Sequence, residues 1–352
     1  MDIFDVAVIG AGPAGSMAAK YAAKAGACTI LLEEHAGAGW PVQCAGLLGQ
    51  EAMAESEISS RSIILQSMRG ATVFSPGCQR LDFKAKAAKA WVVDRRLFDQ
   101  VMLARAVAKG AELRIRSNVR KIRRERGNSI LTLAGGREIK SKIVISAEGV
   151  SARIARQAGI SPSQMILSGA QVQVPFAVED PEKAEVHLGV APGLFGWVIP
   201  LDEGTARIGL CARDRGCEHL RSFLKTDIIK KRLRGSPLAL NVGGLPLGPA
   251  AVTAVEGLLA VGDAAGQVKP TSGGGIYPGL VAAKIAGGVA AAAAIEGDCT
   301  ALRLMEYDRL WRAALGRELE IGMRANRMLG RMSDAELDEL VGYLAAKPRL
   351  IE

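Results

Sequence analysis

Aromatic residues and histidines are scarce in this sequence. Phe, Trp and Tyr together make up 4% of the 352 residues, and only three histidines occur. Nucleic-acid-binding modules stack bases on aromatic side chains, and no zinc finger or RNP-like aromatic motif is visible here. His35, His187 and His219 are isolated in the sequence, which argues against a catalytic triad. We therefore expect no nucleic-acid partner and no catalytic histidine.

Paired cysteines and a leader segment are also missing. The six cysteines include no C-x-x-C pair and have no histidine at zinc spacing, so we expect no metal site. Residues 1–5 are acidic and run directly into an apolar stretch, which excludes a secretory signal and favours the cytoplasm. The longest apolar run, 280–295, contains Lys284 and is mostly Ala and Gly. It is predicted to be too short and too weakly hydrophobic to cross a bilayer.

Glycine and basic residues are plentiful instead. The chain has 41 glycines and a formal net charge of +9, and its basic residues gather at 114–126 and 213–234. Positive charge suits an anionic membrane or an acidic protein partner. The first basic run alternates with apolar residues, however, as in a strand whose outer face is solvated. Glycine concentrated in turns indicates a backbone that approaches a ligand closely.

The apolar pattern predicts an α/β protein. Residues 5–10 have the pattern of a buried parallel strand, 15–24 of an Ala-rich helix and 28–33 of a second strand, which together make a β-α-β unit. The alternating patterns in 62–93 and 161–246 suit an antiparallel sheet with one covered face. The other predicted elements are helices at 97–109, 278–295, 302–307 and 337–344 and strands at 111–116, 129–133, 142–147 and 258–261.

A glycine-rich motif joins the first strand to the first helix. The run Gly10-Ala11-Gly12-Pro13-Ala14-Gly15 fits G-x-G-x-x-G in the required position, and Glu33 follows at the end of the second strand. Gly10 permits the tight turn, Gly12 lets a pyrophosphate reach the helix N-terminus, and Gly15 allows close helix–strand packing. Glu33 can accept hydrogen bonds from the ribose hydroxyls, and Glu34 replaces it if the strand ends one residue later. The motif predicts a dinucleotide site.

A second glycine-rich motif lies far along the chain. Gly262-Asp263-Ala264-Ala265-Gly266 follows a predicted strand, and Pro270-Thr271-Ser272-Gly273-Gly274-Gly275-Ile276 precedes a helix. An Asp at a strand end can bond a ribityl hydroxyl, and consecutive glycine amides ahead of a helix suit the electron-rich edge of a flavin. An enzyme that binds only NAD has no need of this second half. The two motifs together predict FAD, whereas the structural alternative is a glycine loop that merely joins two elements.

These motifs resemble those of known flavoproteins. With Asp94-Arg95-Arg96-Leu97-Phe98-Asp99 between them, they resemble the flavin-binding set of the aromatic-hydroxylase-type flavoproteins. More narrowly, Pro41-Val42-Gln43-Cys44-Ala45-Gly46 and the 269–276 loop resemble the geranylgeranyl reductases, and the likeness extends from Met1 to about Ile295. The resemblance implies a Rossmann-like FAD-binding domain with an antiparallel-sheet substrate domain and C-terminal helices. We expect the FAD-binding domain at 1–61, 94–160 and 247–299, the substrate domain at 62–93 and 161–246, and the helical segment at 300–352.

The family likeness also extends to a substrate-lining motif. Phe195-Gly196-Trp197-Val198-Ile199-Pro200 resembles the family's Y-x-W-x-F-P, with Phe195 for Tyr and Ile199 for Phe. It implies that Phe195, Trp197 and Pro200 line an apolar slot, although sheet-core aromatics are the ordinary alternative. Glu148 stands where relatives carry Asp, and the longer acid is expected to alter contacts near the pyrophosphate.

The resemblance implies a reaction as well. Reduced FAD delivers a hydride from N5 to a prenyl double bond, on an archaeal-type membrane lipid or another polyprenyl compound, and a proton completes the saturation. Cys44 is implied to position the substrate or relay the proton, with Ala45 and Gly46 beside the cofactor and Arg95 near the flavin ring. The alternatives are a small buried cysteine and a surface arginine at a strand end.

Two other functions stay open from the sequence. A flavin-dependent monooxygenase or halogenase shares the fold, and a noncatalytic electron carrier or lipid-binding flavoprotein shares the cofactor. Because only one complete dinucleotide fingerprint occurs, no separate nicotinamide domain is predicted. The electron donor is therefore left open among ferredoxin, NAD(P)H and a reduced deazaflavin. The basic runs can dock an acidic ferredoxin or lie against anionic headgroups at the periphery of a membrane.

Overall fold

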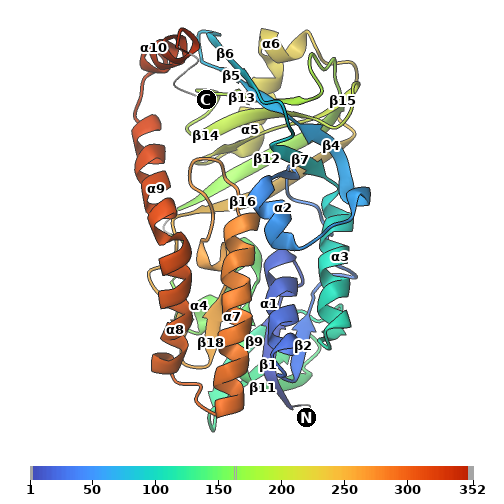
Figure 1. Cartoon of the computed structure of the whole chain (residues 1–352), viewed down its shortest axis with the longest axis vertical. Helices are drawn as coiled ribbons and strands as arrows, with labels where there is room; N and C mark the ends of the chain where they lie inside the picture. The colour runs from blue at the N-terminus through green and yellow to red at the C-terminus, as the bar shows by residue number, and fades with distance from the viewer. Residues whose placement is uncertain (1–2, 162, 164, 348–352) are drawn as a thin grey trace.

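The protein is built around two large β-sheets that lie at opposite ends of an elongated molecule (Figure 1). This computed structural model describes residues 3–161, 163 and 165–347. Strands β1, β2, β8, β11 and β18 of the first sheet are parallel, and β10, β9 and β17 pair antiparallel at its margins. Its strands are β1 (Ile3–Ile9), β2 (Thr29–Leu32), β8 (Glu112–Arg114), β9 (Val119–Glu125), β10 (Asn128–Leu133), β11 (Glu138–Ser146), β17 (Ala254–Val255) and β18 (Leu258–Ala260).

Each strand predicted for this sheet is present. The basic run at 114–126 differs in detail, because β8 ends at Arg114 and β9 starts only at Val119. Arg116 lies between them with a φ of 52°, which bends the chain. From Arg120 onward β9 exposes its basic side chains, as the alternating pattern predicts.

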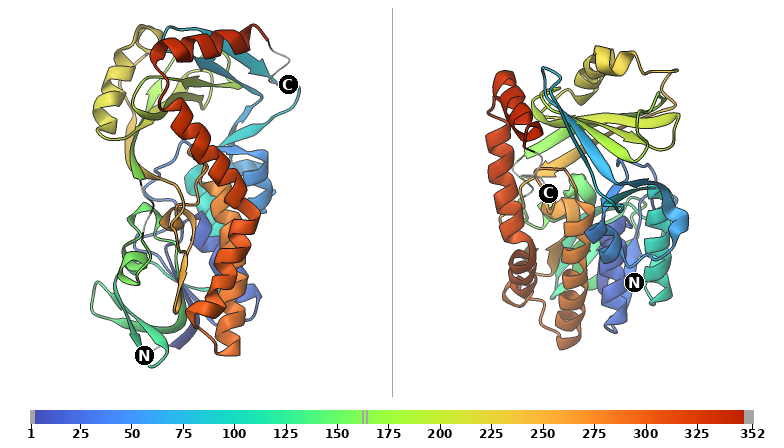
Figure 2. Two further views of the ribbon diagram at one scale, coloured as in Figure 1. Left: turned by 90° about the vertical axis from the view of Figure 1, so that its left-hand side faces the viewer. Right: turned by 45° about the horizontal axis from the view of Figure 1, so that its top comes forward.

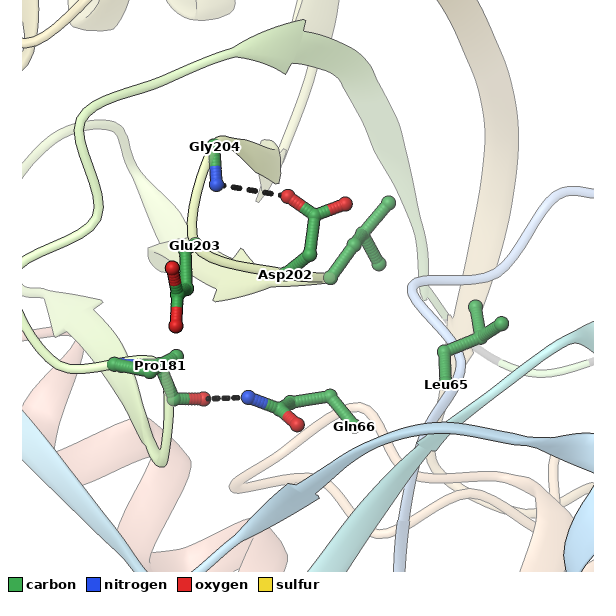
Figure 3. Close-up of a pocket in the computed structure, with 7 residues that line it drawn as sticks. Leu65, Gln66, Pro181, Asp202, Glu203 and Gly204 are labelled. Atoms are coloured by element: carbon green, nitrogen blue, oxygen red, sulfur yellow. Dashed lines mark hydrogen bonds between the residues drawn. The ribbon is translucent and has the colours of Figure 1, made fainter.

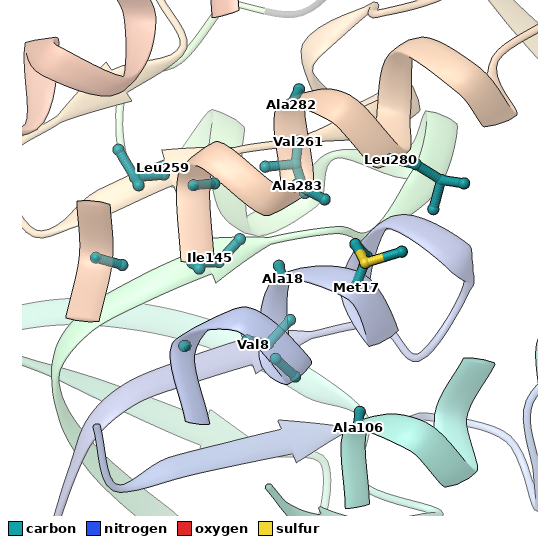
Figure 4. Close-up of a cluster of buried hydrophobic side chains, with 14 of the residues drawn as sticks. Val8, Met17, Ala18, Ala106, Ile145, Leu259, Val261, Leu280, Ala282 and Ala283 are labelled. Atoms are coloured by element: carbon teal, nitrogen blue, oxygen red, sulfur yellow. The ribbon is translucent and has the colours of Figure 1, made fainter. Parts of the chain in front are cut away.

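Helices cover one face of the parallel sheet. Helix α1 (Pro13–Lys24) packs between α3 (Arg95–Ala108) and α7 (Ile276–Glu296), and their small side chains meet β1 in the main hydrophobic core (Figure 4). A Cβ at Gly287 would lie 2.4 Å from the Ala18 carbonyl oxygen, so α1 and α7 approach as closely as two backbones can. The Ala and Gly content of α7 is therefore explained by close helix packing.

Helix α7 corrects one prediction. With 21 residues and a mean hydropathy of 1.6, it is long and apolar enough to cross a membrane by length and composition, contrary to the expectation from 280–295. However, 67% of the 18-residue apolar window of this helix is buried inside the protein. Residues 276–296 form a core helix because α1 and α8 cover them.

The second sheet has seven strands and two unlike faces. It runs in the order β16, β12, β15, β14, β13, β5, β6, and all neighbours are antiparallel except β13 and β5. Helices α5 (Gly216–Lys225) and α6 (Asp227–Lys230) cover one face. The strands are β5 (Gly70–Phe74), β6 (Arg80–Lys84), β12 (Met165–Pro175), β13 (Lys183–His187), β14 (Gly193–Pro200), β15 (Thr205–Ala212) and β16 (Ala239–Leu247).

Short elements connect the two sheets. A three-stranded sheet in the order β3, β7, β4 lies between them. The predicted domain limits, which divide the chain at 61/62 and 93/94 in this region, stay a proposal. The short elements are β3 (Leu47–Gly49), β4 (Ile64–Met68), β7 (Ala90–Val93), α2 (Gln50–Ser56), α4 (Arg153–Gln157), η1 (Arg61–Ile63), η2 (Gly149–Ser151) and η3 (Gly262–Ala265).

The C-terminal helices run along the length of the molecule (Figure 2). Helix α8 (Ala301–Trp311) continues through the π-helical turn η4 (Arg312–Gly316) into α9 (Arg317–Leu329), and α10 (Asp334–Ala345) packs against β6. Two predicted helices are confirmed as α8 and α10, whereas α9 was not predicted. The fold class, an α/β flavoprotein fold with an antiparallel second sheet and C-terminal helices, is confirmed.

Candidate active site

The first glycine motif forms an open turn at the N-terminus of α1. Gly10 has a φ of +98°, and a Cβ there would lie 2.4 Å from the Ala147 carbonyl oxygen. A Cβ at Gly15 would lie 1.8 Å from the Gly10 oxygen, whereas one at Gly12 would meet nothing within 4 Å. No side chain caps α1, and its first turn, which starts with Pro13, contains no acidic residue. The free amides and the open space at Gly12 fit the pyrophosphate of a dinucleotide.

Glu33 is the acid that lies beside this turn. Its Oε2 accepts from the Ala11 N–H at 2.8 Å and its Oε1 from the His35 N–H at 2.8 Å, and its side chain is buried. Glu34 is exposed and accepts instead from the Asn118 amide at 2.5 Å. Of the two acids that the sequence left open, only Glu33 is buried beside the glycine turn.

The second glycine motif meets the first in space. A Cβ on Gly262 would lie 3.1 Å from the Ala14 Cβ, so residues some 250 positions apart are neighbours. Asp263 lies in the turn η3, and burial raises the pKa of its carboxyl, with attraction to Arg95 as a weaker opposing effect. A Cβ on Gly275 would lie 2.9 Å from Asp263 Oδ1, which only glycine tolerates. Helix α7 starts here without a side-chain cap or an acid in its first turn, like α1.

The loop before α7 is held by the C-terminal helices. The Asn326 amide of α9 donates to the Pro270 carbonyl oxygen at 3.1 Å. Tyr307 of α8 donates to the Ala260 oxygen at 2.7 Å and accepts from Gln267 at 2.9 Å, and Gln267 accepts from the Gly262 N–H at 2.8 Å. The α9 contact and this buried network fix the loop in place. The predicted cofactor residues of the loop are Pro270, Gly273, Gly274, Gly275 and Ile276.

Glu148 makes several hydrogen bonds within the protein. Its carboxylate accepts from the Ile154 N–H at 2.9 Å, the Ala155 N–H at 3.2 Å and the Ser146 hydroxyl at 2.7 Å. Ala152 ahead of α4 has a φ of 39° and supplies no cap. The acid therefore caps α4, and the longer side chain reaches the free N–H groups of its first turn.

Cys44 lies between two guanidinium groups. Its Sγ accepts from the Gly46 N–H at 3.3 Å and contacts Arg95. Arg95 is also paired with Asp99 at 3.0 and 3.1 Å. Burial alone would lower the pKa of Arg95, but Cys44 and Asp99 raise it above its usual value.

Arg207 approaches Cys44 from the second sheet. It donates to the Ala45 carbonyl oxygen at 2.7 Å, and burial lowers its pKa although Cys44 and Asp94 attract it. The sequence analysis missed Arg207 and Asp99. Two features of the sequence could have indicated them. Arg207 is a charged residue within the otherwise apolar alternation of β15, and Asp99 is an acid four residues after Arg95.

Aromatic side chains form the facing wall. The indole N–H of Trp197 donates to Gln171 at 3.0 Å, and a Cβ on Gly209 would lie 2.5 Å from the indole ring, so the ring lies flat against the sheet. Phe195 meets Trp197 edge-on, with ring centroids 6.4 Å apart. Further apolar contacts to the Trp197 cluster come from Ala45, Leu194, Leu245 and Met323.

Pro200 is separated from this wall. Its cross-strand partner Ala206 belongs to the core under α5 and α6. Because cross-strand partners share a face of the sheet, Pro200 points away from Trp197. The structure therefore places Trp197 in one cluster with Ala45, the residue after Cys44, and Phe195 beside Trp197, but leaves Pro200 on the other face.

A separate cavity of about 470 Å³ lies beside the turn between β14 and β15 (Figure 3). Gln66 donates to the Pro181 oxygen at 2.8 Å on one side, and Asp202 accepts from Gly204 at 2.8 Å on the other. Because Asp202 and Glu203 line it, this cavity is unsuited to a hydrocarbon chain. We do not assign the substrate to it.

Two comparisons identify relatives of the chain. A family model described as "Lycopene cyclase protein" matches residues 5–208, more than half of the chain. A curated protein named digeranylgeranylglycerophospholipid reductase, from Methanocaldococcus jannaschii, is 35% identical, and the match covers 97% of this chain and 91% of that protein.

Solved structures agree with this assignment. A geranylgeranyl bacteriochlorophyll reductase-like protein from Thermoplasma acidophilum superposes with a TM-score of 0.89 at 28% identity, covering 98% of this chain and 92% of that one. A mutant of halogenase PltM in complex with FAD has a TM-score of 0.75 at 14% identity, with 98% and 84% of the two chains covered, and shows the shared fold alone. The chain belongs to the digeranylgeranylglycerophospholipid reductase family.

Proposed function

We propose that this chain is an FAD-dependent reductase that saturates the double bonds of geranylgeranyl groups in an archaeal-type membrane lipid, and the relatives' name, digeranylgeranylglycerophospholipid reductase, supports this substrate. The observation that carries the proposal is the meeting of two open helix N-termini with an aromatic wall and Cys44 from other parts of the chain. A cofactor-sized polar site and an apolar face thus lie side by side, which is what hydride transfer to an alkene requires.

The residues present fit FAD along both motifs. The backbone N–H groups of Gly12, Ala14 and Gly15 would hold the pyrophosphate, with Pro13, which has no N–H, shaping the turn, and Glu33 would hold the adenosine ribose. Asp263 would accept from the ribityl chain, and the glycine amides ahead of α7 would lie at the flavin. When bound and reduced, the flavin supplies the hydride.

The second sheet would position the alkene. Gln171 fixes the tilt of Trp197 through the indole N–H, and Phe195 limits the slot on one side. Both rings and the adjoining leucines exclude water from the reacting carbons. Arg95 and Arg207 fix the Cys44 loop from two sides, so that Sγ can move a proton to the substrate from a constant position.

An anaerobic assay tests this function. The flavin-loaded protein is reduced with dithionite and mixed with digeranylgeranylglycerophospholipid in detergent, and the lipid mass is followed. We expect a gain of two hydrogens per double bond. Oxygen consumption with NADPH that the lipid stimulates, without any saturated product, would instead indicate a monooxygenase, and a flavin reoxidised only by another protein would indicate an electron carrier.

The physiological reductant is a second part of the proposal. Ferredoxin, NAD(P)H and a reduced deazaflavin are the candidates, and we propose a cytoplasmic enzyme that meets its lipid substrate at the membrane surface. Anaerobic flavin bleaching with each donor in turn distinguishes them, because only the physiological donor should reduce the flavin at the rate of lipid turnover.

A further inference from the structure

A row of exposed apolar side chains follows the edge of the seven-stranded sheet. Leu238, Leu240 and Val242 are 65%, 59% and 46% exposed. Leu240 and Val242 belong to the edge strand β16, and the Leu238 N–H continues its pairing by donating to the Gln173 oxygen at 2.8 Å. Single exposed leucines are common on protein surfaces, but a contiguous row marks an interaction site.

The register shows which face of the sheet carries this row. Leu240 pairs with Val172, and Val242 with Ala170. Val172 and Ala170 pack under α5 and α6 in one hydrophobic core. Since cross-strand partners share a face, the exposed row extends the face that these helices cover, beyond their reach.

The same helices carry much of the positive charge of the protein. Residues 213–234 contain eight Arg or Lys and three Asp or Glu, a net charge of +5 (8 − 3) out of the +9 of the whole chain. Lys231 and Arg215 pair with acids on their own segment. Among the described residues 213–234, the exposed cations that form no ion pair are Arg213, Arg221, Lys225, Lys230 and Arg234.

We propose that this face docks on an anionic lipid bilayer. The docking surface consists of the apolar row Leu238, Leu240 and Val242 and the cations Lys225, Lys230 and Arg234. Aliphatic side chains enter the headgroup region while flanking cations meet lipid phosphates. An acidic protein partner would use the cations but would leave three aliphatic side chains without a role, so the lipid surface is favoured.

The position of the surface fits the proposed function, on which this inference rests. The opposite face of β16 belongs to the active site, because Leu245 packs with the Trp197 cluster and Gln43 lies 3.7 Å from the position of a Cβ on Gly243. The single strand β16 would therefore separate a docked bilayer from the proposed slot. A prenyl chain would reach the slot by passing around the sheet edge, without leaving an apolar environment for long.

Vesicle flotation tests the docking. The full-length, flavin-loaded protein is mixed with phosphatidylcholine vesicles, with or without phosphatidylglycerol, in the absence of substrate. We expect binding to the anionic vesicles only, weakened about tenfold in high salt. Leu238→Ser with Leu240→Ser, and separately the triple change Lys225→Ala, Lys230→Ala and Arg234→Ala, should each weaken binding by at least about tenfold.

Matched controls lie elsewhere on the surface. Leu302→Ser, at a residue 83% exposed on α8, and Lys109→Ala after α3 should leave flotation unchanged. Equal binding to neutral vesicles, or full binding by both docking variants, would overturn the proposal. If the parent protein is a dimer and the Leu238→Ser, Leu240→Ser variant is a monomer, the surface binds a second copy and the proposal is overturned. If the triple cation variant loses only ferredoxin-dependent reduction, the surface binds a protein partner and the proposal is likewise overturned.

Turnover in detergent separates the two proposals. The docking variants should saturate detergent-dispersed lipid at the rate of the parent protein, because none of the changed residues faces the active site. If the parent protein floats with vesicles but never reduces the lipid, the proposed function fails while the docking surface stands.

Discussion

Cys44 is surrounded by side chains that are themselves fixed. Arg95 is held by Asp99 of the same helix, and Arg207 by the Ala45 carbonyl oxygen. A sulfur in so constant a position can deliver a proton along one direction, which an ordinary core cysteine has no need to do. Its oxygen analogue is a much weaker acid and should deliver the proton more slowly.

We therefore expect Cys44→Ser to retain FAD but lose about 100-fold in turnover. Flavin absorbance reports cofactor content, and the anaerobic lipid assay reports the rate. Cys217→Ser, on helix α5 at the far face of the sheet, is the matched control and should change neither. Full turnover by Cys44→Ser would remove the thiol from the mechanism.

Glu33 and Glu34 provide a second comparison between single residues. Glu33→Gln should weaken FAD binding by about 1.5–3 kcal/mol, because a charged acceptor beside the glycine turn is lost. Glu34→Gln should have little effect, since that side chain is exposed and points to Asn118. Titration of the apoprotein with FAD, followed by flavin fluorescence, gives both dissociation constants. Equal losses for the two variants would contradict the assignment of the ribose acceptor.

Among the helices, α1, α2 and α7 are joined by a cluster of charges at Glu57. This carboxylate is bonded to Lys20 and accepts from Tyr21 at 2.6 Å and from Lys284 at 3.1 Å. Burial alone would raise its pKa, but the lysines and Tyr21 lower it to about 2. The cluster therefore fixes the short helix α2, which lies between β3 and β4 of the small sheet in the sequence, against the main core.

The pH dependence of stability follows from this shift. A lowered folded-state pKa means that the contribution of Glu57 is complete above about pH 4.5 and is lost as the pH falls toward about 2. Between these values the free energy of unfolding should fall more steeply for the parent protein than for Glu57→Gln. The difference should be at most about 1 kcal/mol, because the side chain is partly exposed and solvent screens it. Urea unfolding at several pH values measures it, and parallel slopes would contradict the assignment.

The elements also show how much the sequence could predict. The β-α-β unit and both glycine turns follow from local rules of chain geometry, so Gly10, Gly15 and Gly275 could be assigned before their surroundings were known. Arg207 and Pro200 could not be placed, because the face to which a strand residue points depends on a register with strands far along the chain. The role of Glu148 as the cap of α4 could not be predicted either, because it appears only once that helix is positioned.

At the scale of the whole molecule, the C-terminal helices connect the two sheets. Asp338 of α10 accepts from the Gly77 N–H at 2.7 Å and from the Ser75 hydroxyl, at the turn between β5 and β6. The same helical segment fixes the Pro270 loop through Asn326. The distance between the cofactor motifs and the far edge of the second sheet is therefore set partly by this helical connection.

Asp338→Ala tests the connection. It should destabilise the protein by about 1–2 kcal/mol and raise hydrogen exchange in the turn at 75–79, because two donors lose their acceptor. FAD affinity should be unchanged, since the cofactor motifs lie elsewhere. Glu339→Ala, an exposed neighbour on the same helix, is the control, and exchange in the turn that rises equally in both variants would contradict the assignment.

The contact between Ala14 and Gly262 has a consequence for how the protein is made. The two halves of the proposed cofactor site are separated by most of the chain, so a ribosome must release residues up to the start of α7 before FAD can be held from both sides. Cofactor capture is thus a late event in synthesis. More than three quarters of the chain is made before flavin can be held from both sides. Since a ligand that binds only the folded state adds to its stability, flavin supply should decide how much newly made protein survives.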